Sequence, residues 1–261
     1  MQPVIVIKTP KQIDEIRKSC KLARKILLHT KKYIKPGIST EELNKIAHKF
    51  IIKNKAIPAP LNYKGFPKSI SVAINNVVCH GIPSSKDILK KGDIINIDIT
   101  TILNGFYGDT SITFPVGKIS PQTQKLINVT KKVMNLAIKS LKPGKLLNNC
   151  VGKTIENYVS KFGFSSVRQL GGHGVGLEFH EEPFVFHHWL REKKSNPTSN
   201  PILKPGMIFT VEPMINASLN WQIEIDKNDG WTVRTIDNAL SAQFEHTVLI
   251  TNTGHETLTK L

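Results

Sequence analysis

The sequence predicts an α+β fold in which two similar α/β halves pack face to face within one domain. The frame L-K-x-G-x-I-x-x-[I/V]-[D/E] occurs at residues 89–98 and again at 203–212, and each copy ends on an acid. The tripeptide Lys-Pro-Gly also occurs once in each half, ahead of an expected helix. No low-complexity linker separates the halves. We therefore expect one domain over residues 1–261, with half-repeats at about 1–118 and 119–261 and a site between them.

In the first half, a helix is expected to start at Thr9-Pro10, because Thr9 is a candidate N-cap and Gln12 completes a capping-box pattern. Its inward face consists of apolar residues at helical spacing: Ile13, Ile16, Cys20, Ala23 and Leu27. A second helix, capped by Ser39 or Thr40, has its own inward face: Leu43, Ile46, Ala47 and Phe50. Strands are expected at about 70–80, 93–102 and 106–116. Asn104-Gly105, typical of a two-residue hairpin turn, joins the last two.

The second half repeats this order of elements. Ser120-Pro121 opens a helix whose inward residues are Leu126, Val129, Val133 and Leu136. Another helix is expected after residue 147. Strands follow near 166–176, 206–215, 231–236 and 242–251.

Bulk composition indicates a globular protein of a reducing compartment. Hydrophobic residues make up 39% of the chain and charged residues 21%, and no apolar run approaches the roughly 20 residues of a membrane span. The N-terminus lacks a signal-peptide pattern, and three widely spaced cysteines form neither a disulfide framework nor a CxxC clip. We therefore expect a cytoplasmic protein with no membrane association. The net charge of +16 has two explanations, attraction to a polyanion such as ribosomal RNA or biased residue usage, and the sequence does not choose between them.

Two acids of the first half are expected to converge. If Asn104-Gly105 forms the hairpin turn, Thr100 pairs with Asp109, and Asp98 pairs with Ser111. Asp98 and Asp109 then lie on one face as diagonal neighbours, roughly 7–8 Å apart at the backbone. No lysine or arginine lies between Ile94 and Val116, so a bound metal ion is the simplest countercharge.

The second half supplies ligands of the same kind. Glu212 ends the second copy of the frame, Glu245 lies in "SAQFEHT", and His173 is surrounded by glycines in "GGHGVG". An oxygen-rich set without thiolates suits two adjacent divalent ions such as Mn, Fe or Co better than a structural zinc. Two such ions lower the pKa of a water and polarise a carbonyl, which is the chemistry of hydrolysis.

The motifs resemble those of a known enzyme family over nearly the whole chain. They are "VVCHGIP", "NIDIT", "GFYGDTS", "GGHGVGLEFHEEP", "FTVEPM", "DGWTV" and "SAQFEHT". The chain is similar to the type I methionine aminopeptidases of the short bacterial or organellar form. The resemblance implies the pita-bread fold, a pseudo-twofold arrangement of antiparallel sheet covered by helices. It also implies two divalent ions (Co, Mn, Fe or Zn) and removal of the N-terminal methionine from nascent Met-X chains whose second residue is small.

The resemblance also implies roles for individual residues. Asp109 and Glu245 would bridge the two ions, Asp98 would complete one shell, and His173 with Glu212 the other. Glu212 would also accept a proton from the attacking water. His80 would contact the substrate near the scissile nitrogen, and His180 would stabilise the tetrahedral oxyanion. The methionine side chain would sit among four aromatic rings: Tyr63, Phe66, Phe179 and Trp231.

Some features depart from that family or stay open. Pro60 and Ser71 stand where several relatives carry cysteine at the pocket wall. Two stretches, "HHWLREKKSNPTSN" and "NASLNWQIEIDKND", are expected to extend surface loops or hairpins, with His187-His188 as a surface pair. Glu181 and Glu182 are either close to the ligands or solvated. The four aromatic residues could also be simple core residues.

Three other functions compete with this hypothesis. An X-Pro aminopeptidase or prolidase usually carries a large N-terminal domain, whereas the motifs here begin by residue 80. A non-enzymatic relative that binds RNA or the ribosome generally loses metal ligands, and all five are present. A Cys79-His80 thiol nucleophile lacks the rest of a Cys-His system. We therefore expect a metallo-exopeptidase that acts as a monomer, and its net charge of +16 is compatible with a transient contact with the ribosome.

Overall fold

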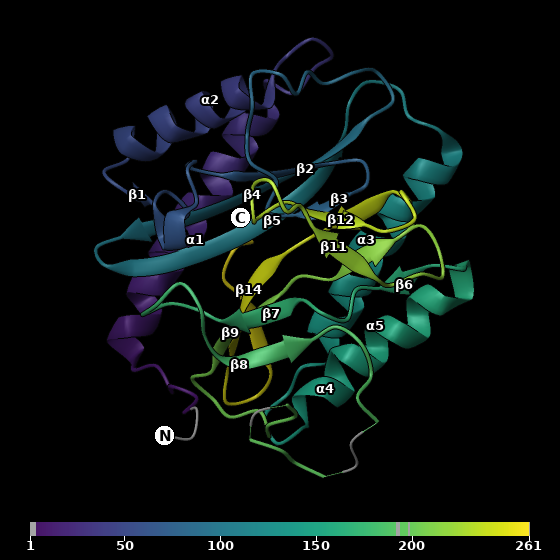
Figure 1. Cartoon of the computed structure of the whole chain (residues 1–261). Coiled ribbons are helices and arrows are strands. Elements are labelled where there is room, and N and C mark those ends of the chain that lie inside the picture. The colour runs from purple at the N-terminus through teal and green to yellow at the C-terminus, as the bar shows by residue number, and fades with distance from the viewer. Residues whose placement is uncertain (1–3, 192–193, 198, 261) are drawn as a thin grey trace.

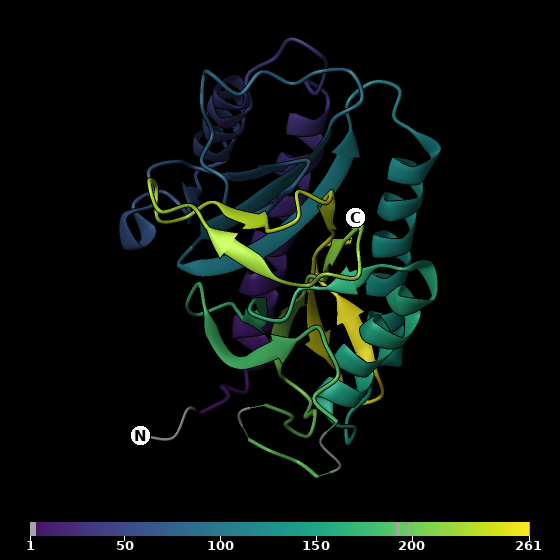
Figure 2. The same cartoon turned by 45° about the vertical axis from the view of Figure 1, so that its right-hand side comes forward.

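The computed structural model describes residues 4–191, 194–197 and 199–260. Helices form the outer flanks and the strands lie between them, with α1 and α2 on one flank and α3 and α5 on the other (Figures 1 and 2). All strand pairings between named strands are antiparallel. No helix in the described part of the chain is both long and apolar enough to cross a membrane.

Helix α1 (Pro10–Lys31) covers the long hairpin of the first half. Its start is confirmed as a capping box: the Gln12 N–H donates to Thr9 Oγ1 (3.4 Å), and the Thr9 N–H donates to Gln12 Oε1 (2.9 Å). Helix α2 (Thr40–Lys53) is capped in the same way by Ser39. A Cβ on Gly108 of the hairpin would lie 2.3 Å from the backbone nitrogen of Cys20, so only glycine permits α1 to lie this close.

The hairpin consists of β4 (Ile94–Leu103) and β5 (Phe106–Pro115). Asn104 and Gly105 both have positive φ angles, 53° and 83°, as a two-residue hairpin turn of type I′ requires. The predicted register is confirmed, with Thr100 opposite Asp109 and Asp98 opposite Ser111. The other edge of β4 pairs with two short strands, β1 (Ile57–Pro58) and β2 (Ser71–Ile74).

The second half has its own helical layer. Helix α3 (Pro121–Ser140) starts at the predicted Ser120 cap, and it packs against α5. The next expected helix is interrupted at Val151, where φ is −92° and ψ is −72°, and so is divided into α4 (Leu147–Cys150) and α5 (Gly152–Val159). A Cβ at Gly152 would lie 2.2 Å from the carbonyl oxygen of His188, so only glycine fits where α5 begins. Two short 3₁₀ turns complete the helical elements: η1 (Tyr63–Gly65) and η2 (Ser160–Phe162).

The remaining strands form three small sheets. The largest has the order β15-β14-β9-β7-β8, and the others have the orders β13-β10-β6 and β11-β12-β3. Their bounds are β3 Val77–Cys79, β6 Ser165–Ser166, β7 Gly171–Gly174, β8 Glu181–Phe186, β9 Ile208–Val211, β10 Met214–Asn216, β11 Ile223–Ile225, β12 Val233–Thr235, β13 Ser241–Gln243, β14 His246–Ile250 and β15 His255–Thr257. The strands expected at 70–80, 166–176, 206–215 and 242–251 are each split in two. β8 and β15 were not expected. β11 lies in the second extended stretch, where a loop or a hairpin was expected, and it forms a hairpin with β12.

The two halves make matching backbone hydrogen bonds around their repeated turns. Gly37 N–H donates to Leu89 O in the first half, and Gly144 N–H donates to Leu203 O in the second, both at 2.8 Å. The frame glycines correspond in the same way: Gly92 N–H donates to Val116 O at 3.0 Å, and Gly206 N–H to Ile250 O at 2.9 Å. All four glycines have positive φ angles between 81° and 101°. The repeated sequence frames therefore build repeated turns, which lead into β4 and β9 and so toward the two matched acids.

Candidate active site

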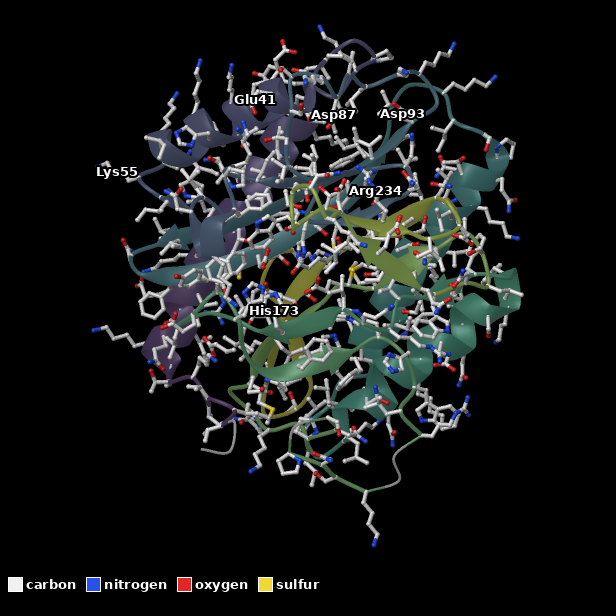
Figure 3. All side chains as sticks on the ribbon, viewed as in Figure 1. Glu41, Lys55, Asp87, Asp93, His173 and Arg234 are labelled. Atoms are coloured by element: carbon white, nitrogen blue, oxygen red, sulfur yellow. The ribbon has the colours of Figure 1, made fainter. Side chains whose placement is uncertain are left out.

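The five predicted metal ligands meet between the two halves. Asp98 and Asp109 lie on β4 and β5, and His173 lies in the middle of β7, among the central strands, whereas charged residues such as Glu41 and Lys55 lie at the outer edge (Figure 3). Glu212 and Glu245 complete the set, and all five line one cavity of about 570 Å³. One ligand atom from each of Asp109, His173 and Glu245 lies within 4.8 Å of the other two.

Glu212 and Glu245 lie where their strands are interrupted. β9 pairs with β14 up to Val211 and His246, and β10 pairs with β13 from Met214 and Gln243. Pro213, which has no N–H to donate to a ladder, follows Glu212 directly. The freed Glu245 N–H instead donates to Ser111 O on β5 at 3.0 Å. These breaks release both acids from the regular alternation of a strand and tie β5 to the second half.

His173 presents an unprotonated ring nitrogen to the carboxylates. Its Nδ1 lies 3.0 Å from Gly174 O, and because a carbonyl oxygen only accepts, Nδ1 must carry the proton. Its Nε2 lies 3.6 Å from Glu212 Oε1 and 3.8 Å from Asp109 Oδ2. Burial lowers the pKa of His173 to about 4, so the ring is neutral and Nε2 keeps a lone pair for a metal ion.

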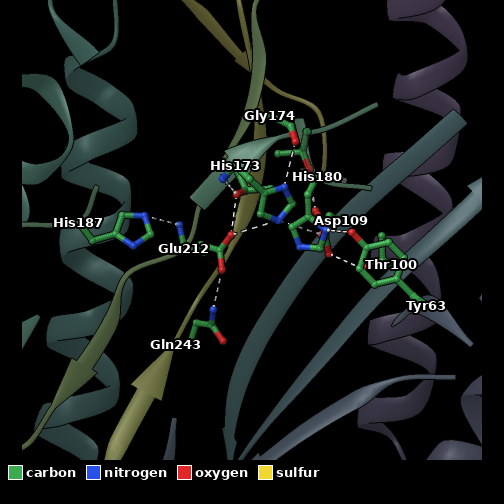
Figure 4. A network of polar contacts seen from close by, with 11 residues as sticks. Tyr63, Thr100, Asp109, His173, Gly174, His180, His187, Glu212 and Gln243 are labelled. Carbon is green, nitrogen blue, oxygen red and sulfur yellow. Dashed lines mark hydrogen bonds and ion pairs between the residues drawn. The ribbon is translucent and has the colours of Figure 1, made fainter. Parts of the chain in front are cut away.

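A network of hydrogen bonds fixes Glu212 and its neighbours (Figure 4). Thr210 Oγ1 donates to Glu212 Oε1 at 2.6 Å and accepts a hydrogen bond from the backbone N–H of His173 at 2.9 Å. Gln243 Nε2 donates to Glu212 Oε2 at 3.0 Å, and on the opposite wall Thr100 Oγ1 donates to Asp109 Oδ1 at 2.8 Å. None of these three supporting residues was predicted. Thr100 was identifiable in principle, because it directly faces Asp109 across the predicted hairpin.

The four acids lack a protein countercharge. Among the described residues that line the cavity, Lys64 is the only lysine or arginine, and it is exposed. Burial is the first cause that raises the pKa values of all four acids, and mutual repulsion raises those of Asp98, Glu212 and Glu245 further. Asp98 Oδ1 is buried with no hydrogen-bond partner among the described residues. Such a set of oxygens and one imidazole fits two divalent ions, which would neutralise the acids and satisfy that orphaned oxygen.

The predicted pocket residues line the same cavity. Phe66 packs edge-on against Trp231, with ring centroids 5.2 Å apart, and Tyr63 contacts Phe179 at 4.8 Å. Pro60, Ser71, Leu170, Met214 and Phe184 also line the cavity. The aromatic residues therefore form an apolar compartment directly beside the acids, and only Phe66 among the four is buried, at 4% exposure.

Two histidines also reach the cavity. The His180 ring lies 4.2 Å from that of His173, and its Nδ1 lies 3.0 Å from the hydroxyl of Tyr63. His180 is exposed on its outer side, but partial burial of its ring in the cavity wall, with His173 and His80 nearby, lowers its pKa to about 3. His80 has a φ angle of 55°, a strained value for a non-glycine residue, and burial lowers its pKa. Both side chains are therefore neutral and able to donate one hydrogen bond to a bound molecule.

The surroundings of His187 and Cys79 bear on two expectations from the sequence. His187 is not a surface residue: it is fully buried, and its Nε2 accepts the Glu212 backbone N–H at 3.3 Å (Figure 4). The expectation failed because pairing of β7 with β8 and β9 carries the end of β8 inward, a tertiary effect. Burial and the nearby Glu212 and Asp98 raise the pKa of Cys79 well above its usual range, which disfavours the thiolate that a nucleophile requires.

The chain is similar to known peptidases over nearly its whole length. Residues 14–252 match the metallopeptidase family M24. The methionine aminopeptidase of Buchnera aphidicola (subsp. Acyrthosiphon pisum) is 49% identical over 97% of this chain and 93% of its own length, and that of Escherichia coli K12 is 47% identical over 98% and 94%. The crystal structure of methionine aminopeptidase from Rickettsia prowazekii superposes with a TM-score of 0.93 at 46% identity, over 98% of this chain and all of that one.

A more distant similarity concerns the fold alone. The prolidase from Pyrococcus horikoshii has a TM-score of 0.75 at 23% identity, and the alignment covers 63% of that chain. The pita-bread arrangement predicted from the motifs is thus confirmed by both kinds of relative. With a family match over most of its length and close relatives over nearly all of it, the chain belongs to the metallopeptidase family M24.

Proposed function

We propose that this protein is a methionine aminopeptidase, which hydrolyses the first peptide bond of chains that begin with methionine followed by a small residue. The observation that carries the proposal is the position of the aromatic compartment directly beside the cluster of acids. The compartment suits a polarizable thioether, and the acids suit the ions that activate hydrolysis. Relatives at 44–49% identity bear the same name.

The chain's own residues have separate tasks in this proposal. Two divalent ions would be held by the side chains of Asp98, Asp109, His173, Glu212 and Glu245, and would lower the pKa of a water and polarise the scissile carbonyl. Asp109 and Glu245 would be ligands shared by both ions. Glu212, oriented by Thr210 and Gln243, accepts the proton of the attacking water. Both carboxylate oxygens of Glu212 are held by these hydrogen bonds, so little reorganisation accompanies the proton transfer.

The histidines act on the substrate. His180 is proposed to donate a hydrogen bond to the developing oxyanion, and His80 to contact the scissile nitrogen. Because neutral His180 carries a single proton, donation to the oxyanion requires its Nδ1 to accept from the hydroxyl of Tyr63. Tyr63, Phe66, Phe179 and Trp231 enclose the methionine side chain in this proposal. The second residue then lies close to the acids, which explains a preference for small side chains.

One assay tests the proposal. The protein is supplied with Mn, Fe or Co, or with chelator, and release of free methionine is measured from Met-Gly-Met-Met and Met-Lys-Met-Met. We expect metal-dependent release from the first peptide only. An X-Pro dipeptide is included, because hydrolysis of that substrate with no release of methionine would assign a prolidase-like activity instead. Equal cleavage of both methionine peptides would contradict the size limit at the second residue.

We further propose that the protein acts in the cytoplasm as a monomer composed of half-repeats at about 1–118 and 119–261, and that its basic surface contacts the ribosome transiently. The net charge of +16 supports this contact, as do the exposed lysines along α1, among them Lys11, Lys21 and Lys25. Co-sedimentation with ribosomes should occur at low salt and disappear at high salt. Absence of co-sedimentation at low salt would leave biased residue usage as the explanation of the charge.

A further inference from the structure

A lysine ahead of the first helix is buried next to the active-site cavity. Lys8 is 3% exposed, and its side chain has no solvent access, whereas its neighbours Ile7 and Thr9 are exposed. The Lys8 N–H donates to Gly206 O at 3.0 Å, which fastens this segment to the turn that leads into β9. Its Nζ donates to Val6 O at 3.3 Å and forms an ion pair with Glu181. Burial of a lysine is costly unless a charge is paired with it, so this contact requires an explanation.

Glu181 uses its other carboxylate oxygen to close a loop. Its Oε1 accepts the backbone N–H of Leu177 at 2.7 Å and that of Glu178 at 2.9 Å. Its Oε2 contacts Lys8. The side chain of Glu181 is 7% exposed, so one nearly buried carboxylate makes three contacts, two with the loop and one with the N-terminal segment. Its two backbone partners lie three and four residues before it, and the carboxylate therefore holds both ends of residues 177–181 together.

That loop carries two of the proposed substrate-contacting residues. Phe179 and His180 lie between the backbone partners of Glu181 and Glu181 itself, and both line the cavity. The loop has little freedom at its start: Gly176 O accepts the Tyr107 N–H at 2.9 Å, and a Cβ on Gly176 would lie 2.5 Å from Ile16 Cδ1 and 3.6 Å from Lys8 Cε. β8 begins at Glu181, so the loop is fixed on this side by the sheet.

We propose that Lys8 and Glu181 are positioning residues, and that their buried ion pair holds the 177–181 loop so that Phe179 and His180 face the substrate. Lys8 compensates the charge of the Glu181 carboxylate. Oε1 then accepts from the loop while Oε2 contacts the N-terminal segment. The inference rests on the proposed function only for the tasks given to Phe179 and His180. The arrangement of the loop itself is testable without any assay of activity.

The variants separate charge, length and hydrogen bonding. Lys8→Met keeps most of the side-chain volume and leaves the Glu181 carboxylate buried without its cation, whereas Lys8→Arg keeps the charge. Glu181→Gln keeps one acceptor oxygen, so the double variant Lys8→Met/Glu181→Gln contains no unpaired charge and can still accept from the loop. The controls are Lys11→Met and Glu224→Gln, which make the same changes at exposed positions outside the loop.

Two measurements are made on each folded, metal-loaded variant: kcat and KM for a Met-Ala peptide, and hydrogen exchange of the Leu177 and Glu178 amides. Lys8→Met should lower kcat by up to about 100-fold, since small misplacements of groups at the reaction centre have effects of this size. It should also speed exchange of both amides. Lys8→Arg should restore part of the loss, the double variant should be more active than Lys8→Met, and both controls should match the wild type.

The outcomes that would overturn the inference differ from those that would overturn the function. If the wild type releases no methionine, the proposed function fails, and the exchange data alone then decide whether the pair fixes the loop. Unchanged exchange at Leu177 and Glu178 in Lys8→Met would overturn the inference. Additive losses in the double variant would also overturn it, because they would show that the two residues act independently. If Lys8→Met does not fold, Glu181→Gln and the double variant supply the same comparison.

Discussion

The hydroxyl of Thr100 offers a sensitive test of the proposed metal site. Thr100 is 2% exposed, and its Oγ1 donates to Asp109 Oδ1 at 2.8 Å. Thr100→Val removes this donor with almost no change in shape. The neighbouring Thr101 is fully buried on the opposite face of β4, where its Oγ1 donates to Ser19 O at 3.2 Å. Thr101→Val is therefore a matched control that loses a hydrogen bond remote from the acids.

The magnitude follows from the charge of the acceptor. A hydrogen bond to a charged group contributes about 1.5–3 kcal/mol. Removal of a partner that orients a metal-ligating group typically lowers metal affinity or activity by about 10–100-fold. At about 1.4 kcal/mol per factor of ten, that range is about 1.4–2.8 kcal/mol, so the two ranges agree. Thr101→Val should instead cost about 1 kcal/mol of folding stability, the usual contribution of a neutral hydrogen bond, and leave metal affinity unchanged.

The assay is release of methionine from a Met-Ala peptide as a function of free Mn²⁺, set with a metal buffer. Thr100→Val should need about 10–100 times more free Mn²⁺ for half-maximal activity than the wild type or Thr101→Val. Thermal unfolding of the metal-free proteins checks that both variants fold. Equal Mn²⁺ dependence in Thr100→Val and the wild type would refute the reasoning, as would an equal shift in Thr101→Val, because Asp109 would then not depend on this donor.

Three further predictions test the site. Asp98→Asn or Glu245→Gln should abolish activity at metal concentrations that saturate the wild type, with an unchanged circular-dichroism spectrum; near-normal turnover by either variant would contradict the two-ion site. His180→Ala should lower kcat by about 10²–10³-fold and change KM far less, because an oxyanion contact forms mainly in the transition state; a change in KM alone would assign His180 to ground-state binding. Metal binding near pH 7 should release protons, because burial raises the pKa values of Asp109 and Glu212 in the metal-free protein and the ions need their ionised forms. Calorimetry in two buffers of different ionisation enthalpy measures this release, which should diminish as the pH rises above those pKa values; release that grows with pH would contradict the direction of the shifts.

Much of the first half was predictable because its geometry is set locally. The Asn104-Gly105 turn and the alternation of β4 fix the register, and the register brings Asp98 and Asp109 to one face. The interruption of β9 at Glu212 had a local signal too, since Pro213 cannot donate to a ladder. That signal was outweighed by the continuous apolar pattern of the segment.

Other features depend on packing between distant segments and left no local signal. His187 is polar and follows a strand that was not expected, and only the pairing of β7 with β8 and β9 shows that it faces Glu212. Lys8 and Glu181 lie 173 positions apart, and nothing in either segment indicates the other. Charged residues are usually exposed, so sequence alone predicts the wrong burial for a charged residue whose partner lies far away along the chain.

The division of the proposed ligands among separate strands has a consequence for biosynthesis. Asp98 and Asp109 belong to one hairpin that can close as soon as it has emerged from the ribosome. Glu245 follows β13 and precedes β14, so the set is incomplete until those strands have joined β10 and β9. A growing copy of this enzyme therefore lacks part of its proposed ligand set, and should cut no peptide, until residues 241–250 have been made. Its activity begins only when the late strands close over that hairpin, so an interrupted translation product that lacks them is inert rather than partly active.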